Sequence, residues 1–195
     1  ALSSVLQMRL AREAEEYQQL MAEHAHQGAG NNGKSNGSAL ESKAELGGQP
    51  ERSCVLVHGT TWPSKEYPEA AWRAVIEKLV AQDYSVFLLS GSDTEFQRAK
   101  RLCHDDNGQP VSQAHAVAPD KLIAAAKRIA TAPVVIGVDS GLTHLAAVLG
   151  RPTVGLYGPT SAKRTGVRGP YAIDLVSQFS CAPCLARECR YEGAA

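Results

Sequence analysis

The chain has 195 residues, enough for one sizeable domain and an appendage, and its 20 Lys and Arg balance its 20 Asp and Glu. A formal net charge of +0 gives no global field that would favour nucleic acid or an acidic surface as a partner. No apolar run approaches the roughly 20 residues of a membrane span. No secretory signal is recognisable and the five cysteines are an odd number, so we expect a reduced, cytoplasmic setting.

The first 52 residues are expected to lie outside the compact part of the chain. Residues 1–26 carry a loose apolar stripe at helical spacing, which predicts a helical segment. Residues 27–52 are rich in Gly, Asn and Ser, which predicts a flexible linker. We therefore expect one compact domain over residues 53–195.

From residue 53 onward, short apolar runs alternate with amphipathic segments. The runs predict strands over residues 54–57, 86–89, 114–117, 134–138, 153–157 and 172–176. The amphipathic segments predict helices after Pro68, after Asp93, over 120–130 and from Gly141 to Leu149. Strands that alternate with helices pair in parallel through right-handed crossovers, so the predicted fold class is α/β, a Rossmann-like parallel sheet flanked by helices.

The stretch from Val134 to Leu149 is predicted as a buried strand that turns directly into a helix. Asp139 and Ser140 are favoured helix N-caps, and Gly141 lets another molecule approach the backbone closely. A helix that begins at the carboxyl end of a parallel strand directs free N–H groups into a crevice, where phosphates bind in α/β proteins. The alternative is that Asp139 and Ser140 only cap the helix, and the pattern leaves both interpretations open.

Other polar residues follow neighbouring strands at the same predicted edge. Thr60, Thr61 and Lys65 offer hydroxyls and a charge that suit a diphosphate, although an ordinary exposed turn has the same composition. Glu95 is placed to meet ribose hydroxyls, or serves only as a first-turn residue that the helix dipole favours. His144 stays near the start of its helix, although a lone histidine is more often simply packed. Their joint placement favours a ligand site.

Four segments together resemble one known family. They are His58-Gly-Thr-Thr-x-x-x-Lys65-x-x-Pro68-x-x-x-Trp72, Gly91…Glu95-x-x-Arg98-Ala-Lys100-Arg-Leu, Val138-Asp-Ser-Gly-Leu-Thr-His144-Leu-Ala-Ala and Leu156-Tyr-Gly-Pro-Thr160. They resemble the ADP-heptose:lipopolysaccharide heptosyltransferases, most closely the heptosyltransferase I branch. The resemblance covers about residues 53–191. It implies the C-terminal, donor-binding half of a two-domain GT-B glycosyltransferase.

The resemblance also implies how the donor ADP-heptose is held. Thr60, Thr61 and Lys65 would hold the diphosphate, Glu95 the ribose, and residues 117–120 would line the adenine. The reaction implied is inverting glycosyl transfer to the lipopolysaccharide inner core, with no cofactor and no metal required.

The remaining implied donor contacts come from the segment after the fourth strand. Ser140 and Gly141 would present helix N–H groups to the phosphates, whereas Asp139 and His144 would face the heptose. Negative charge accumulates on the departing diphosphate, so Lys65 and the helix dipole would also act in the transition state, with Asp139 beside them.

One feature of the family is missing from the sequence. The family's general base is an aspartate of the N-terminal domain, and residues 1–52 are too short and polar to form that domain. No catalytic base is therefore assigned in this chain. The expected partners are the nucleotide-sugar donor and, through the missing domain, the lipopolysaccharide core acceptor, with no nucleic acid and at most peripheral contact with the inner membrane. A non-catalytic nucleotide-binding module, or a GT-B-like transferase or epimerase with another nucleotide sugar, remains an alternative.

Three cysteines cluster near the end of the chain. Cys181, Cys184 and Cys189 resemble a segment found in the heptosyltransferase II branch. Their spacing provides three ligands for zinc or an iron–sulfur cluster, but a fourth would be needed and no histidine follows Cys189. Reduced thiols or a structural turn are the favoured interpretation.

Overall fold

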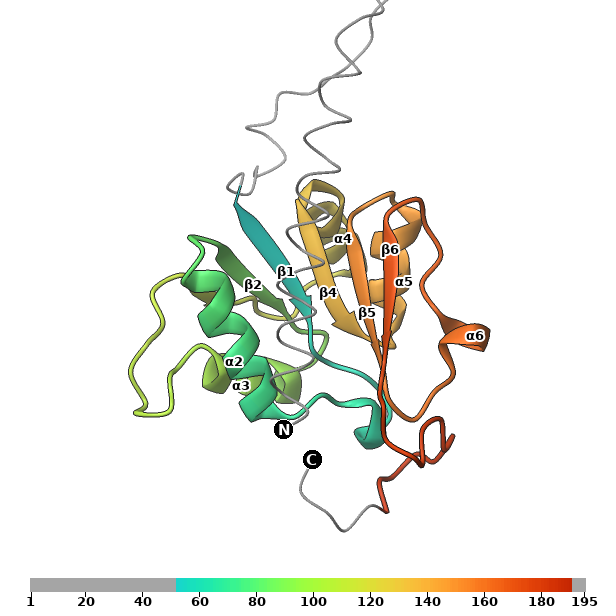
Figure 1. Ribbon diagram of the computed structural model, residues 1–195. Coiled ribbons are helices and arrows are strands. Elements are labelled where there is room, and N and C mark those ends of the chain that lie inside the picture. Colours follow the sequence, from blue (N-terminus) through green and yellow to red (C-terminus); the bar gives the residue numbers. More distant parts are fainter. Residues whose placement is uncertain (1–51, 191–195) are drawn as a thin grey trace, which may run out of the picture. The chain divides into compact units, whose positions relative to one another are not determined.

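The computed structural model describes residues 52–190, so the predicted helix over residues 1–26 and nearly all of the predicted linker lie outside the described residues. Within this range the chain forms one six-stranded parallel sheet with the order β3-β2-β1-β4-β5-β6 (Figure 1). The strands are β1 (Ser53–Val57), β2 (Ser85–Leu89), β3 (Ala114–Ala116), β4 (Val134–Val138), β5 (Thr153–Tyr157) and β6 (Ala172–Val176). All six predicted strands are present, and the predicted fold class is confirmed.

Helices cover both faces of this sheet. The longer ones are α2 (Glu69–Val80), α3 (Asp93–Leu102), α4 (Leu122–Thr131) and α5 (Gly141–Val148). The helices α2 and α3 lie on one face, and α4 and α5 lie on the other (Figure 1). The four predicted helices are therefore present, with ends that differ by one or two residues. The short helices η2 (Pro63–Lys65) and α6 (Ala162–Thr165) were not predicted.

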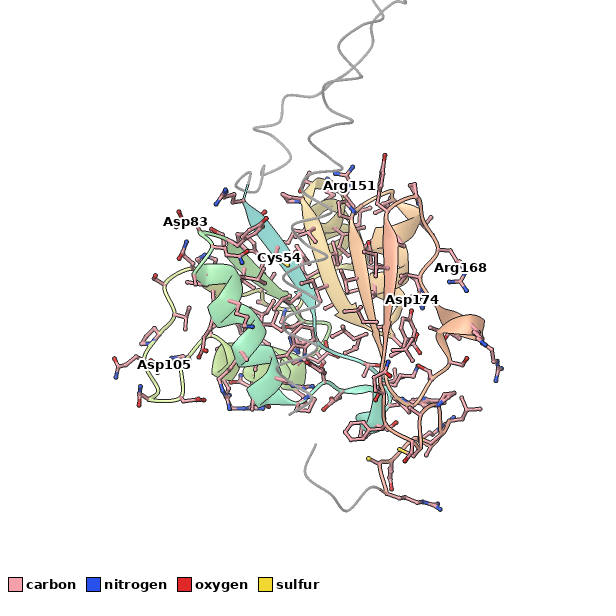
Figure 2. The ribbon with its side chains drawn as sticks, in the orientation of Figure 1. Cys54, Asp83, Asp105, Arg151, Arg168 and Asp174 are labelled. Atoms are coloured by element: carbon pink, nitrogen blue, oxygen red, sulfur yellow. The ribbon has the colours of Figure 1, made fainter. Side chains whose placement is uncertain are left out.

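The central strand β1 explains why the sequence begins its compact part with an unbroken apolar run. Every residue of β1 is buried, because the strand pairs with β2 on one side and β4 on the other and is covered on both faces. Val55 lies opposite Phe87 of β2 and Val135 of β4. Cys54 lies on the same strand inside the sheet (Figure 2), and burial raises the pKa of its thiol well above the usual range.

The order of the strands reverses between β1 and β4. These strands are hydrogen-bonded neighbours although β2 and β3 lie between them in the sequence. The chain leaves β1 towards α2 on one face and leaves β4 towards α5 on the other. Such a switch point opens a crevice at the carboxyl ends of the two strands, where ligands bind in open α/β sheets. In the described part of the chain, no helix is long and apolar enough to cross a membrane.

Candidate functional site

The carboxylate of Asp139, directly after β4, is the centre of a polar cluster at this edge. The Lys65 Nζ atom lies 2.9 Å from Asp139 Oδ2, and the Thr160 hydroxyl donates a hydrogen bond of 2.7 Å to the same oxygen. The His144 Nε2 atom lies 3.2 Å from Asp139 Oδ1. Only 6% of the Asp139 side chain is exposed, so its charge is sheltered from water. Loops after β1 and β5 and the first turn of α5 thus converge on one group.

These contacts decide the ionisation of Asp139. Burial alone would raise its pKa, because a charged carboxylate loses its hydration. Hydrogen bonds from Thr160, Lys65 and His144, together with the charge of Lys65, outweigh this effect and hold the pKa of Asp139 below its usual value. Asp139 is therefore ionised at neutral pH and forms a close ion pair with Lys65.

The turn between β4 and α5 is held by two threonines. The Thr60 hydroxyl donates to the Asp139 carbonyl at 3.2 Å, and the buried Thr143 hydroxyl donates to the Val138 carbonyl at 2.7 Å. Ser140 is the N-cap residue of α5, but its side chain accepts no capping hydrogen bond and instead lies 3.1 Å from the Thr143 hydroxyl. The Ser140 side chain therefore does not cap the helix, and the ligand-binding role of Asp139 and Ser140 stays a prediction.

The start of α5 is open in front. Gly141 is the first residue of the helix and is exposed, and a Cβ atom added there would meet no other atom within 4 Å. Because Ser140 caps none of the first N–H groups, they are available at the switch point, as anion binding at a helix N-terminus requires.

Ser92 caps the start of α3, and Glu95 lies in the first turn of this helix. The Ser92 hydroxyl accepts a hydrogen bond of 3.2 Å from the Glu95 N–H, and Glu95 Oε2 accepts one of 2.6 Å from the Gly91 N–H, which resembles a capping box. The Glu95 carboxyl also lies against the loop after β1, because a Cβ atom added at Gly59 would fall 2.3 Å from Glu95 Cδ. The helix-start role is thus present in the structure, and the ribose-binding role stays a prediction.

The structure places the other predicted residues at the same edge with fewer contacts. Thr61 is exposed beside Thr60. Residues 117–120 follow β3 as predicted, and the Val117 N–H donates to the Leu88 carbonyl at 2.9 Å. The cluster proper therefore consists of Lys65, Asp139, His144 and Thr160, with Thr60 and the start of α5 next to it. Thr160 belongs to the fourth motif of the family resemblance, but no role was predicted for it.

His58, the first residue after β1, is buried just before the loop that carries Thr60 and Lys65. Its side chain is fully buried, and neither ring nitrogen has a hydrogen-bond partner among the described residues. Burial, and then the charge of Arg98, lower the pKa of His58 to about 4, against an opposing effect of Glu69. Its ring is therefore neutral at physiological pH.

The family model of glycosyltransferase family 9 (heptosyltransferase) matches residues 6–195. The chain belongs to this family. The resemblance that the four motifs carry is thereby confirmed.

Similar family 9 proteins include lipopolysaccharide heptosyltransferase 1 of Pseudomonas aeruginosa, which is 41% identical over 138 residues, 71% of this chain and 38% of that protein. The solved structure "E. coli heptosyltransferase WaaC with ADP" is 32% identical with a TM-score of 0.60, over 65% of this chain and 38% of that one. A second, "E. coli heptosyltransferase WaaC with ADP-2-deoxy-2-fluoro heptose", is 31% identical with a TM-score of 0.56, over 64% of this chain and 36% of that one. The chain therefore spans well under half the length of these relatives.

A C-terminal segment covers the edge of this family 9 domain, and we call residues 177–190 the clasp. The Leu185 N–H donates to the Pro159 carbonyl at 2.8 Å, next to the loop that carries Thr160. The Ser64 hydroxyl, one residue before Lys65, donates to the Ala186 carbonyl at 2.6 Å. The clasp therefore joins the loops after β1 and β5. Nothing in its sequence pattern predicted this.

The cysteines of the clasp are free and exposed. Over residues 52–190, no group of three or more His, Cys, Asp or Glu side chains is arranged to hold a metal ion. The interpretation of Cys181, Cys184 and Cys189 as metal ligands therefore has no geometric support in the structure.

An open depression of about 420 Å³ lies away from the cluster, over α2, α3 and the loop after α3. Its lining includes Arg73 and Asp106, which form an ion pair of 3.1 Å with each other. It contains none of the predicted site residues, so we do not regard it as the family 9 site.

Proposed function

We propose that this chain is the donor-binding part of a glycosyltransferase that moves heptose from ADP-heptose to the lipopolysaccharide inner core with inversion. The cluster of Lys65, Asp139, Thr160 and His144 at the switch point carries the proposal, because family motifs supply every member. Structures of the E. coli relative with ADP and with a fluorinated ADP-heptose support a nucleotide-sugar donor.

The diphosphate would bind between Lys65 and the first turn of α5. The Lys65 ammonium supplies one positive charge, and the uncapped N–H groups beyond Ser140 and Gly141 supply donors and the positive end of the helix dipole. Thr60 and Thr61 add hydroxyls on the side of β1. As the bond to the anomeric carbon breaks, charge grows on the diphosphate, so these groups stabilise the transition state more than the bound donor.

Asp139 and His144 would face the heptose. When Lys65 turns to the phosphates, Asp139 still accepts from Thr160 and contacts His144, so it remains ionised and able to orient sugar hydroxyls. The His144 side chain is 37% exposed, which leaves part of its ring accessible from the crevice.

The chemistry at the acceptor is proposed to lie elsewhere. An acceptor hydroxyl attacks the anomeric carbon, and we assign the base that removes its proton to a region outside the match, since the chain covers 38% of the P. aeruginosa relative. In this proposal the reaction needs no cofactor and no metal, and it takes place in the cytoplasm, with at most peripheral contact with the inner membrane.

Calorimetric titration of ADP-heptose, ADP and UDP-sugars into the chain tests the proposal. We expect selective binding of ADP-heptose. Replacing Lys65 with alanine should weaken binding about tenfold or more, because it removes a charge-assisted contact to phosphate. Asp139→Ala should also weaken it, with circular dichroism to verify folding. Lys78→Ala is the matched control, because Lys78 is an exposed residue in the last turn of α2.

The outcomes separate the alternatives. Equal binding of UDP-sugars and ADP-heptose would make this a transferase or epimerase for another nucleotide sugar. ADP binding without turnover, even when the acceptor half of a family 9 relative is supplied, would indicate a non-catalytic nucleotide-binding module. If neither ADP nor ADP-heptose binds, the proposal is wrong.

A further inference from the structure

The cluster carries too little positive charge to balance a diphosphate ligand. Lys65 is its one permanent cation, and Asp139 balances that charge at a distance of 2.9 Å. A diphosphate carries more than one negative charge, so its burial at this edge calls for a further cation. The fold offers one from the clasp, which lies outside the motifs that suggested the site.

Arg187 is held beside Lys65 by the loop after β1. Its carbonyl accepts a hydrogen bond of 3.1 Å from the N–H of Ser64, the residue directly before Lys65. This bond holds the Arg187 backbone next to the loop that carries Lys65. Both cations lie over the ring of Trp62, with Lys65 Nζ 4.6 Å and Arg187 Cζ 5.3 Å from the ring centroid. One aromatic side chain thus orients two positive charges in the same loop region.

The guanidinium of Arg187 is available for a ligand. Its side chain is exposed, and no carboxylate within residues 52–190 forms an ion pair with it. Contact with an aromatic ring occupies the flat face of a guanidinium and leaves its edge N–H donors free, and these match the spacing of phosphate oxygens. Arg98 and Arg101, by contrast, are paired with Glu66 and Glu69.

We propose that Arg187 is a second diphosphate-binding residue, which the clasp delivers to the donor site to share the phosphate charge with Lys65. The inference rests on the proposed function and assigns the clasp a part in it. Because charge grows on the leaving diphosphate, Arg187 stabilises the departing group as well as the bound donor. The alternative is that Arg187 only packs on Trp62, in which case it contributes to folding but not to binding.

Titration calorimetry on the full chain with ADP, adenosine and inorganic pyrophosphate separates these roles. Arg187→Gln keeps a planar polar side chain but removes the charge, and we expect it to weaken ADP binding about tenfold while leaving adenosine binding unchanged. The ADP affinity of Arg187→Lys should fall between that of the wild type and that of Arg187→Gln, because lysine keeps the charge without the fork of donors. Arg190→Gln removes the same charge from the same exposed segment and should change ADP affinity by less than about twofold.

Salt dependence gives a second readout that packing would not change. The logarithm of the affinity for ADP should fall more steeply with the logarithm of the salt concentration in the wild type than in Arg187→Gln, because one fewer ionic contact is screened.

Each outcome decides one question. Equal ADP affinity in Arg187→Gln and Arg190→Gln would overturn the inference and leave the proposed function intact. A parallel loss of adenosine binding in Arg187→Gln would show a structural role and also overturn it. If the wild type binds pyrophosphate through Arg187 but does not bind ADP, the anion site stands and the nucleotide assignment fails. If it binds neither, both fail.

Discussion

Asp139 shows what sequence can and cannot establish about a single residue. Its place after an apolar run predicted that it lies at the carboxyl edge of the sheet, and the structure confirms this position. The pattern left its role open between capping and ligand binding, because the donors that reach it, Lys65 and Thr160, belong to distant loops. Long-range neighbours of this kind depend on the order of the strands, which the sequence alone does not state.

The glycines of the site offer a contrast at the same scale. A Cβ atom at Gly141 meets open space, whereas one at Gly59 would fall within 2.7 Å of both Glu95 carboxylate oxygens. We expect Gly141→Ala to leave the melting temperature nearly unchanged and to weaken ADP binding, because the methyl group occupies the space that a phosphate needs. Differential scanning fluorimetry and calorimetric titration measure the two effects.

Gly59→Ala is the counterpart of this change. The new methyl group displaces Glu95 and breaks its hydrogen bond to the Gly91 N–H, which should destabilise the fold by about 1 kcal/mol.

Strong ADP binding by Gly141→Ala would contradict close approach of a ligand to the start of α5.

At the level of elements, the regular part of the fold followed from the sequence. The buried strands appear as apolar runs, and α2, α3, α4 and α5 appear through their periodicity, since each is long enough to repeat it. The helices η2 and α6 have three and four residues, too few for a period to be visible. Their positions depend on contacts with the rest of the fold.

The clasp could not be predicted for a different reason. Its cysteine spacing suggested a metal site or a structural turn, whereas its position depends on hydrogen bonds to Ser64 and Pro159, far away in the sequence. A segment without apolar periodicity carries no local signal of where it docks.

Removal of the Ser64 hydroxyl should loosen the clasp. Ser64→Ala deletes the 2.6 Å hydrogen bond to the Ala186 carbonyl, worth about 1 kcal/mol. Tryptic cleavage after Arg187, followed by mass spectrometry, should therefore become about fivefold faster, because the free energy needed to open the segment falls by that amount. Ser112→Ala, at an exposed loop serine, is the control. An unchanged rate would show that the clasp does not depend on this contact.

For the molecule as a whole, His58 links folding to pH. The folded pKa of about 4 lies below the usual 6.5 of histidine, so between these values the unfolded chain binds more protons than the folded one. The contribution of His58 to stability is complete above pH 6.5 and disappears as the pH falls towards 4. The loss is on the order of 3 kcal/mol.

Replacing His58 with leucine should remove this acid-sensitive step. Neither ring nitrogen has a described partner, so an apolar side chain of similar size loses no hydrogen bond. We expect the free energy of unfolding of the variant, measured by urea denaturation, to equal or exceed that of the wild type at pH 5. The difference between the two proteins should be smaller at pH 7.5. His115→Gln, at an exposed histidine, should retain the step. If His58→Leu loses stability in parallel with the wild type from pH 6.5 to 4, the buried ring is not its origin.

The ion pair between Lys65 and Asp139 also bears on the speed of nucleotide exchange. In the free site Lys65 is already paired with Asp139. Lys65 would therefore lose its carboxylate contact when it gains a phosphate contact, and part of the free energy of binding would be cancelled. In the proposed site, the Asp139 carboxylate lies close enough, at 2.9 Å in the free site, to pair with Lys65 again when the nucleotide leaves. We expect such a site to bind ADP with moderate affinity and a short residence time, which would suit the proposed transferase, because it would have to release ADP before the next donor binds.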